Sequence, residues 1–248
     1  QLASGYLHSA VTILFLLLVV RDALLLLTCL SAAPQAGSVK FSTGIRKKAR
    51  IGFWAFTLVL LALALSGYGM REALRVPSVR EVRMQIPGLL THERFRIAQL
   101  SDLHIGPTFG KAWLADVVAR TDSLNPSLIV ITGEWWTAPR HALPKDVAPS
   151  GSQGKYGVIL TPGNHEYYSG LQQWLPVFQS LGMRVLMNEN TQIRVNGTPL
   201  AIAGVTDTAA LNWGWKPDPE KALSGLSKDI AKIMLSHRPR SRRKAPSR

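Results

Sequence analysis

Hydrophobic and polar positions divide the chain into a strongly apolar front section and a longer mixed section. Residues 51–70 form an uncharged apolar run, which as a helix is long enough to cross a hydrocarbon core of about 30 Å. Residues 11–30 are also apolar, but Arg21 and Asp22 interrupt them. The pattern predicts transmembrane helices over about 11–30 and 51–70. In an alternative interpretation, the first span ends near Val20 and the run after it lies at the interface or packs on a neighbour.

Beyond residue 91, short apolar runs alternate with turn residues. The runs predict strands over 95–100, 127–132, 156–160, 184–187, 192–195, 200–205 and 231–235, and helices over 112–123 and 171–181. Early strands alternate with helices, and a later pair is joined by a hairpin turn at Asn196-Gly197. We therefore predict an α/β domain with a mixed sheet. Residues 137–155, rich in Pro, Gly and Ser, are predicted to form a long surface loop.

The net charge of +14 is unevenly distributed. Residues 92–230 carry twelve basic and twelve acidic side chains, whereas residues 231–248 carry seven basic side chains and no acid. The remaining excess lies in residues 1–91. A nucleic-acid-binding face would be expected within the folded section, so we expect no nucleic-acid partner. The single cysteine, Cys29, excludes an intrachain disulfide framework.

The charges also suggest an orientation in the membrane. Residues 31–50 carry five basic side chains and no acid, which by the positive-inside rule places this loop in the cytoplasm. Everything after Arg71 would then lie outside the cytoplasm. Four arginines follow the second span, so the charge difference across that span is small.

Polar side chains follow several of the predicted strands, where α/β sheets form their sites. They are Asp102, His104, Glu134, Asn164, His165, Glu166, Asp207 and His237. If Asp102 and His104 continue a strand, both side chains point the same way and can reach one metal ion. Mixed oxygen and nitrogen ligands suit Mn, Fe, Zn or Mg. A lone Asp-x-His pair is more typical of a turn or a cap, and each of the other residues alone is also typical of a turn, a strand end or a surface charge. Their order along the chain, each after an apolar strand, favours a metal site.

In these stretches the sequence resembles the calcineurin-like metallophosphoesterases, and in particular their bacterial membrane-anchored branch. The matching segments are IAQLSDLHIG (97–106), LIVITGE (128–134), YGVILTPGNHEYYSG (156–170), AIAGVTD (201–207) and IMLSH (233–237). The resemblance implies a two-sheet α/β sandwich flanked by helices. It also implies a membrane region over 1–70, a linker over 71–91, a metallophosphoesterase domain over 92–237 and a basic disordered tail over 238–248.

The resemblance further implies a dinuclear site for two divalent metal ions. Asp102 and His104 would bind the first ion, Asn164 and His237 the second, and Glu134 occupies the position of a bridging aspartate. His165 would lie beside the phosphate, as a proton donor or as a stabiliser of transition-state charge. Glu166, Tyr167 and Asp207 would contact these ligands or the substrate. Two such ions can neutralise phosphate oxygens and lower the pKa of a bridging water.

Three departures from the family pattern lead us to expect weak or absent hydrolysis by this chain. Glu134 replaces an aspartate, and Thr137 replaces a second aspartate that would orient a ligand. The family's Gly-His-x-His segment is missing after His237, where the chain reads RPRSRRKAPSR. We therefore expect an incomplete domain. A catalytically dead, membrane-anchored pseudoenzyme or scaffold is the alternative, and weak electrostatic docking of the basic tail on anionic lipid or nucleic acid is a further one.

The substrate implied by the resemblance is a phosphomonoester or phosphodiester. Membrane-anchored relatives are associated with phospholipid or lipid-precursor phosphoesters, so we expect a lipid-linked substrate and a bacterial inner-membrane location. Tyr167, Tyr168, Trp135 and Trp136 would form an apolar rim beside the site. Ordinary core or loop positions explain the same aromatic residues equally well.

Overall fold

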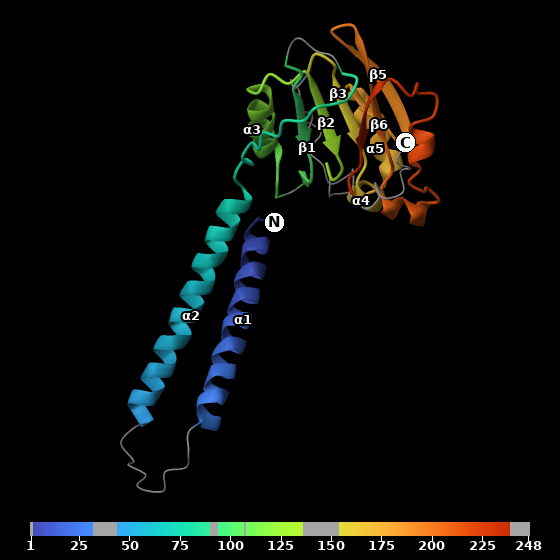
Figure 1. Ribbon diagram of the computed structural model, residues 1–248. Helices are drawn as coiled ribbons and strands as arrows, with labels where there is room; N and C mark the ends of the chain where they lie inside the picture. Colours follow the sequence, from blue (N-terminus) through green and yellow to red (C-terminus); the bar gives the residue numbers. More distant parts are fainter. Residues whose placement is uncertain (1, 32–43, 90–93, 107, 136–153, 239–248) are drawn as a thin grey trace. The chain divides into compact units, whose positions relative to one another are not determined.

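A computed structural model describes residues 2–31, 44–89, 94–106, 108–135 and 154–238. The chain divides into two compact units, Gln1–Arg75 and Val76–Arg248 (Figure 1). Three sequence predictions fall largely or wholly outside the described residues: the 137–155 loop, the roles of Trp136 and Thr137, and the disordered tail.

The first unit is a pair of long helices, α1 (Leu2–Ser31) and α2 (Gly44–Ala73), that run side by side (Figure 1). The hydroxyl of Tyr6 donates a hydrogen bond to the backbone oxygen of Leu63 at 2.9 Å. Gly5–Leu24 and Phe53–Ala73 are long and apolar enough to cross a membrane. The helix α1 continues through Arg21 and Asp22, which form an ion pair with each other at 2.6 Å.

The second unit contains two sheets. Four parallel strands form the first, in the order β1 (Ile97–Leu100), β2 (Leu128–Thr132), β3 (Val158–Thr161) and β4 (Met183–Val185). The second sheet contains β5 (Glu189–Val195), β6 (Thr198–Gly204) and β7 (Ala231–Leu235). In it, β5 and β6 pair antiparallel, and β6 and β7 pair parallel.

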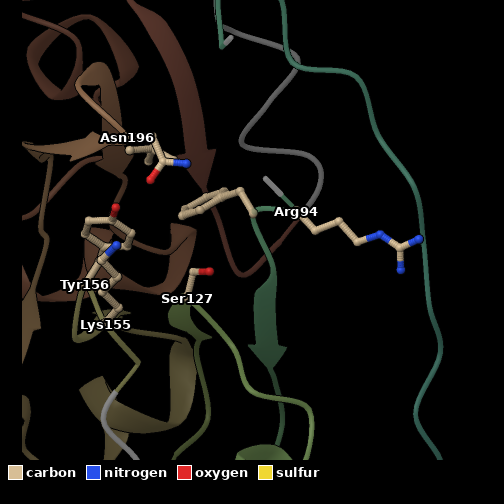
Figure 2. A pocket seen from close by; sticks show the side chains of 7 residues that line it. Arg94, Ser127, Lys155, Tyr156 and Asn196 are labelled. Atoms are coloured by element: carbon tan, nitrogen blue, oxygen red, sulfur yellow. The ribbon is translucent and has the colours of Figure 1, made fainter. Parts of the chain in front are cut away.

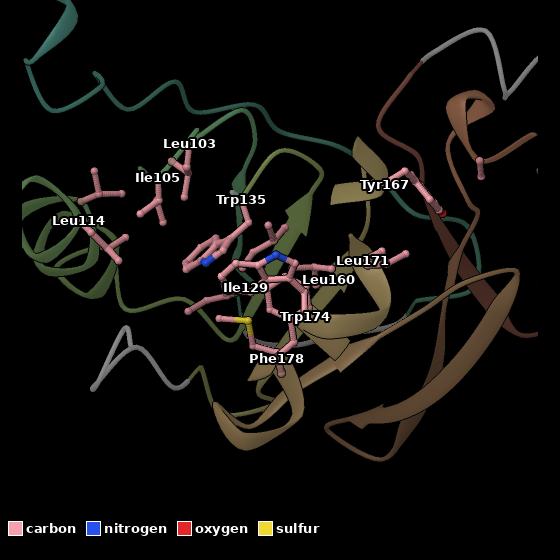
Figure 3. Close-up of a cluster of buried hydrophobic side chains, with 14 residues drawn as sticks. Leu103, Ile105, Leu114, Ile129, Trp135, Leu160, Tyr167, Leu171, Trp174 and Phe178 are labelled. Carbon is pink, nitrogen blue, oxygen red and sulfur yellow. The ribbon is translucent and has the colours of Figure 1, made fainter. Parts of the chain in front are cut away.

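The strand β2 shows how the layers are arranged, because both of its faces are buried. Ile129 and Ile131 belong to a core cluster that includes residues of α3 (Lys111–Asp122) and α5 (Leu171–Ser180) (Figure 3). Leu128 and Val130 belong to a second cluster shared with the other sheet. Burial of each such side chain contributes about 1.5–3 kcal/mol.

The outer face of the second sheet is covered in turn. Ala203 of β6 packs with Ala222 of the short helix α6 (Pro219–Ala222). The resulting order is helices, sheet, sheet, helix, which confirms the predicted sandwich of sheets flanked by helices.

Two short helices beside the strand ends were not predicted. They are α4 (Asn164–Tyr168) and the 3-10 helix η2 (Thr208–Trp213). Neither is long enough to show a helical period in the sequence. The hairpin turn was correct, since Asn196 and Gly197 both have positive φ, at 48° and 87°, as a type I′ turn requires.

The segment expected to be a linker contributes to the second unit. Ile86 and Leu89 pack against the cluster between the two sheets, and Val76 packs against the cluster beneath α3 and α5. The helix α2 extends to Ala73. The stretch between the last helical residue and the first core contact is therefore only a few residues long.

Candidate metal-binding site

The site is built where the strands of the first sheet end. Because β1, β2 and β3 are parallel, their carboxyl ends lie at one edge of the sheet. Beyond this edge, the backbone N–H of His104 donates to the oxygen of Glu134 at 2.8 Å, and that of Ile105 donates to the oxygen of Trp135 at 2.9 Å. These bonds hold the loops after β1 and β2 side by side.

The backbone of three site residues is in the left-handed region. Asp102, His104 and Glu134 have φ of 55°, 47° and 52°. Among the described residues, the other non-glycine positions with positive φ are all asparagines, which tolerate it best. Such a conformation costs about 1–2 kcal/mol per residue, and such strain clusters at functional sites. The strand-like geometry predicted for Asp102 and His104 was therefore wrong, because β1 ends at Leu100.

The carboxylate of Glu134 lies at the centre of the site, with only 8% of its side chain exposed. Its Oε2 is 2.6 Å from Nε2 of His104. Its Oε1 is 3.4 Å from Nε2 of His237 and 3.9 Å from Nε2 of His165. One carboxylate thus faces imidazoles that come from the ends of three different strands.

Among the residues that the structure describes, two groups of side chains could hold a metal ion, and both contain Glu134. One consists of His104, Glu134 and His165, and the other of Asp102, Glu134 and His237. Within each group the ligand atoms lie within 4.8 Å of one another. Imidazole and carboxylate donors together fit divalent ions such as Zn, Fe or Mn. Asn164, the first residue of α4, is half-buried and directly precedes His165.

His237 is oriented by the backbone of the other sheet. Its Nδ1 lies 3.0 Å from the oxygen of Thr132. A proton on Nδ1 would donate to that oxygen and leave the lone pair of Nε2 facing Glu134. Outer hydrogen bonds of this kind fix the tautomer and the ring orientation of metal-binding histidines.

Two glycines allow His237 and the backbone of Glu134 to lie close to the neighbouring strand ends. A Cβ on Gly133 would lie 2.4 Å from Nδ1 of His237, and a Cβ on Gly163 would lie 2.9 Å from the backbone nitrogen of Glu134. Any side chain at either position would displace a residue of the site. The glycines of the TGE and PGN segments are therefore required by packing at the strand ends.

Glu166 connects the segments after β2 and β3 by hydrogen bonds. Only 1% of this residue is exposed. Its Oε2 accepts hydrogen bonds from the backbone N–H groups of Glu134 at 2.9 Å and Gly163 at 2.8 Å. Its position joins the segments that follow β2 and β3.

Asp207 is also buried, and it connects η2 to the segment after β7. Its Oδ1 accepts from the N–H of Ala209 at 2.7 Å, which caps η2. Its Oδ2 lies 3.3 Å from Nε of Arg238, the residue that follows His237. The sequence reasoning did not single out Arg238. A buried carboxylate is costly unless it is paired, so knowledge that Asp207 is buried would have indicated a nearby cation.

The structure separates the four aromatic residues that were considered for a rim. Trp135 and Tyr167 are buried in the core cluster beside α3 and α5 (Figure 3), so their placement at a rim was wrong. Burial raises the pKa of Tyr167 above its usual value, and the Asp207 carboxylate raises it further. Tyr168 is exposed, and Trp136 lies outside the described residues.

A small pocket lies away from this site, at the amino ends of the first three strands (Figure 2). Its volume is about 80 Å³, and its lining includes Phe95, Ser127, Tyr156 and Asn196. In Figure 2 the Arg94 side chain extends away from the other lining residues. The pocket contains none of the residues predicted to carry chemistry.

The sequence is similar to a known protein family and to several named proteins. The family model for calcineurin-like phosphoesterases matches residues 95–246. A Bos taurus protein named "Transmembrane protein with metallophosphoesterase domain" is 33% identical, over 75% of this chain and 45% of its own length. A Danio rerio protein of the same name is 30% identical, with the same coverage of both chains.

A bacterial relative has a similar extent of match. A Campylobacter jejuni protein named as an uncharacterized metallophosphoesterase is 28% identical, over 75% of this chain and 49% of its own length. The chain thus spans about half the length of these relatives. The match to the family model covers more than half of the chain and contains all the residues gathered around Glu134. The chain therefore belongs to the calcineurin-like phosphoesterase family.

Proposed function

We propose that the cluster around Glu134 binds two divalent metal ions and hydrolyses a phosphomonoester or phosphodiester. Asp102 and His104 would hold the first ion, Asn164 and His237 the second, and Glu134 would contribute to both. The observation that carries the proposal is the position of Glu134, whose carboxylate belongs to both groups of potential ligands. Mn, Fe, Zn and Mg all suit these donors.

In the proposed reaction the metal ions and His165 have different roles. Bound divalent ions would neutralise phosphate oxygens and lower the pKa of a water molecule. The ring of His165 packs edge-on against His104, with centroids 5.0 Å apart, and its side chain is partly exposed. We assign to His165 the donation of a proton to the leaving oxygen or the stabilisation of its charge.

The membrane helices are part of the proposal. Two helices of sufficient length and apolarity support anchoring of the chain in a bilayer, as does the word "transmembrane" in the names of two relatives. We place the chain in a bacterial inner membrane with its second unit outside the cytoplasm. Alkaline phosphatase fused after residue 91 should then be active. Activity only from a cytoplasmic reporter at the same position would contradict this orientation.

Anchoring also bears on the substrate. A hydrolase tethered by two membrane helices is kept close to lipids, which favours a phospholipid or a lipid precursor as the phosphoester. This part of the proposal depends on anchoring and is separate from the chemistry of the site.

The direct test is hydrolysis of p-nitrophenyl phosphate and bis-p-nitrophenyl phosphate by the full chain with added Mn²⁺. We expect activity that a His165→Ala variant lacks. We expect it to be slow, below the range of about 1–10³ s⁻¹ common for enzymes, because the longer Glu134 replaces the family's aspartate. Metal bound without any hydrolysis would favour a scaffold, and turnover equal in the His165→Ala variant would contradict the proposed site.

A further inference from the structure

Three exposed apolar side chains lie on α4 and η2, in positions that the proposed chemistry does not use. Tyr168 and Leu211 are each 57% exposed, and Trp213 is 47% exposed. We call these three residues the apolar ledge. We propose that the ledge binds the hydrocarbon part of the phosphoester and makes esters with an alkyl or acyl chain the preferred substrates. This inference rests on the proposed function and adds the residues that select the substrate.

The ledge is continuous with the site through ring contacts. His165 and Tyr168 pack edge-on with centroids 5.7 Å apart. Tyr168 in turn lies 5.7 Å from Trp213, measured between ring centroids. A phosphoester held near His165 would therefore have Tyr168 and then Trp213 beside the group attached to its phosphate.

The ledge is also firmly held, as a specificity surface must be. Trp213 belongs to η2, whose first turn is capped by Asp207 and whose Ala209 and Ala210 are buried. Arg238 contacts both Asp207 and Thr208, at 3.3 Å and 3.2 Å. The start of η2 is thus tied to the residue that follows His237. Tyr168 is the last residue of α4, and its ring contacts the rings of His165 and Trp213.

The chemistry of the ledge favours a hydrocarbon chain. The helix η2 (TAALNW) itself carries no charged residue. Leu211 provides only apolar contact. The rings of Tyr168 and Trp213 are tilted by 46°, so they do not form parallel walls for a flat base. Burial of each methylene against such a surface contributes about 0.8 kcal/mol.

The two long apolar helices of the same chain give independent support for a chain-bearing ligand. Their length and composition suit a bilayer, where phosphoesters with acyl chains are abundant. A clustered apolar surface beside a site commonly marks the place where an apolar partner binds.

The test uses a series of p-nitrophenyl alkyl phosphates, from methyl to hexyl, with the full chain in nanodiscs. The leaving group is constant, so only the hydrocarbon changes. We expect kcat/KM to rise at least about tenfold from methyl to hexyl, since each fully buried methylene corresponds to about fourfold. Trp213→Ala and Leu211→Ala should each reduce the hexyl-to-methyl ratio by about fivefold, mainly through KM.

Met84→Ala is the matched control, because it removes an even more exposed apolar side chain from the segment before β1. It should leave the whole series unchanged. A flat dependence on chain length, or a slope that survives in both ledge variants, would overturn the inference and leave the proposed hydrolysis intact. Hydrolysis of none of these diesters and of no p-nitrophenyl phosphate would overturn the proposed function.

Binding provides a readout that does not need turnover. Hexyl phosphate should change the tryptophan emission of the wild-type chain, and Trp213→Phe should remove most of that change although six of the seven tryptophans remain. Methyl phosphate should have no such effect. An equal response in the Trp213→Phe variant would overturn the ledge whether or not the chain is active.

Discussion

The buried carboxylate of Glu166 accepts a hydrogen bond from the backbone nitrogen of Glu134 at 2.9 Å. The same oxygen accepts a second bond from the nitrogen of Gly163 at 2.8 Å. One side chain thereby fixes the backbone of the central carboxylate residue against the start of α4, which carries Asn164 and His165. The geometry of the site depends on this connection as much as on the residues that face Glu134.

Replacement of Glu166 by alanine should destabilise the second unit. It leaves two buried N–H groups without acceptors, at about 1–3 kcal/mol each, and we expect a total loss of about 2–6 kcal/mol. Thermal unfolding followed by near-UV circular dichroism measures the effect. Glu166→Gln keeps one acceptor oxygen and should fall between wild type and Glu166→Ala. An unchanged Tm in Glu166→Ala would contradict the assigned role.

Gly133→Ala should displace His237 and weaken metal binding. The added Cβ would lie 2.4 Å from Nδ1 of His237, at a φ of +77°. Gly157→Ala is the matched control, because its φ is +81° and nothing lies within 4 Å of the added Cβ. The control isolates the backbone cost of about 1–2 kcal/mol.

The two glycine variants are compared by Tm and by Mn²⁺ titration. We expect Gly157→Ala to bind Mn²⁺ like the wild type, and Gly133→Ala to bind at least about tenfold more weakly. Equal affinities in the two variants would show that the position of His237 does not matter for metal binding.

Arg238→Ala should destabilise the end of the second sheet. It removes the cation 3.3 Å from Oδ2 of the buried Asp207. Loss of one partner from a buried pair costs about 3–5 kcal/mol, but Arg238 is partly exposed, so we expect about 1–3 kcal/mol. Arg238→Lys should recover part of the loss. A double-mutant cycle with Asp207→Asn checks the coupling, and additive effects would mean that the two residues do not act together.

Much of the fold could be predicted because its central strands are continuous apolar runs. β2 was located to within a residue, since burial on both faces leaves a strong signal. Both bounds of β7 were predicted correctly, although it is an edge strand, because its apolar run ends at Ser236-His237. The helices α4 and η2 were missed, because five or six residues show no period. Division into two sheets was implied by the family resemblance, whereas the strand pattern predicted only a mixed sheet.

The site could be located in part. Polar residues at strand ends pointed to the correct edge of the sheet, and Asp102, His104, His165 and His237 all lie near Glu134. The left-handed backbone conformation of Asp102, His104 and Glu134 could not be predicted from the sequence. At a strained functional site the residue type is set by its chemistry and not by its preference for a backbone conformation. The contact between Asp207 and Arg238 was missed for another reason, since it joins residues 31 positions apart in sequence through their burial.

The central claim is that Glu134 is shared by two metal ions. Its most direct test is metal content per chain, measured by inductively coupled plasma mass spectrometry after incubation with Mn²⁺ and desalting. We predict about two ions per wild-type chain, and a loss of both in Glu134→Gln, whose side chain keeps the shape but not the charge. Retention of two ions by Glu134→Gln, or their absence from the wild-type chain, would contradict the account.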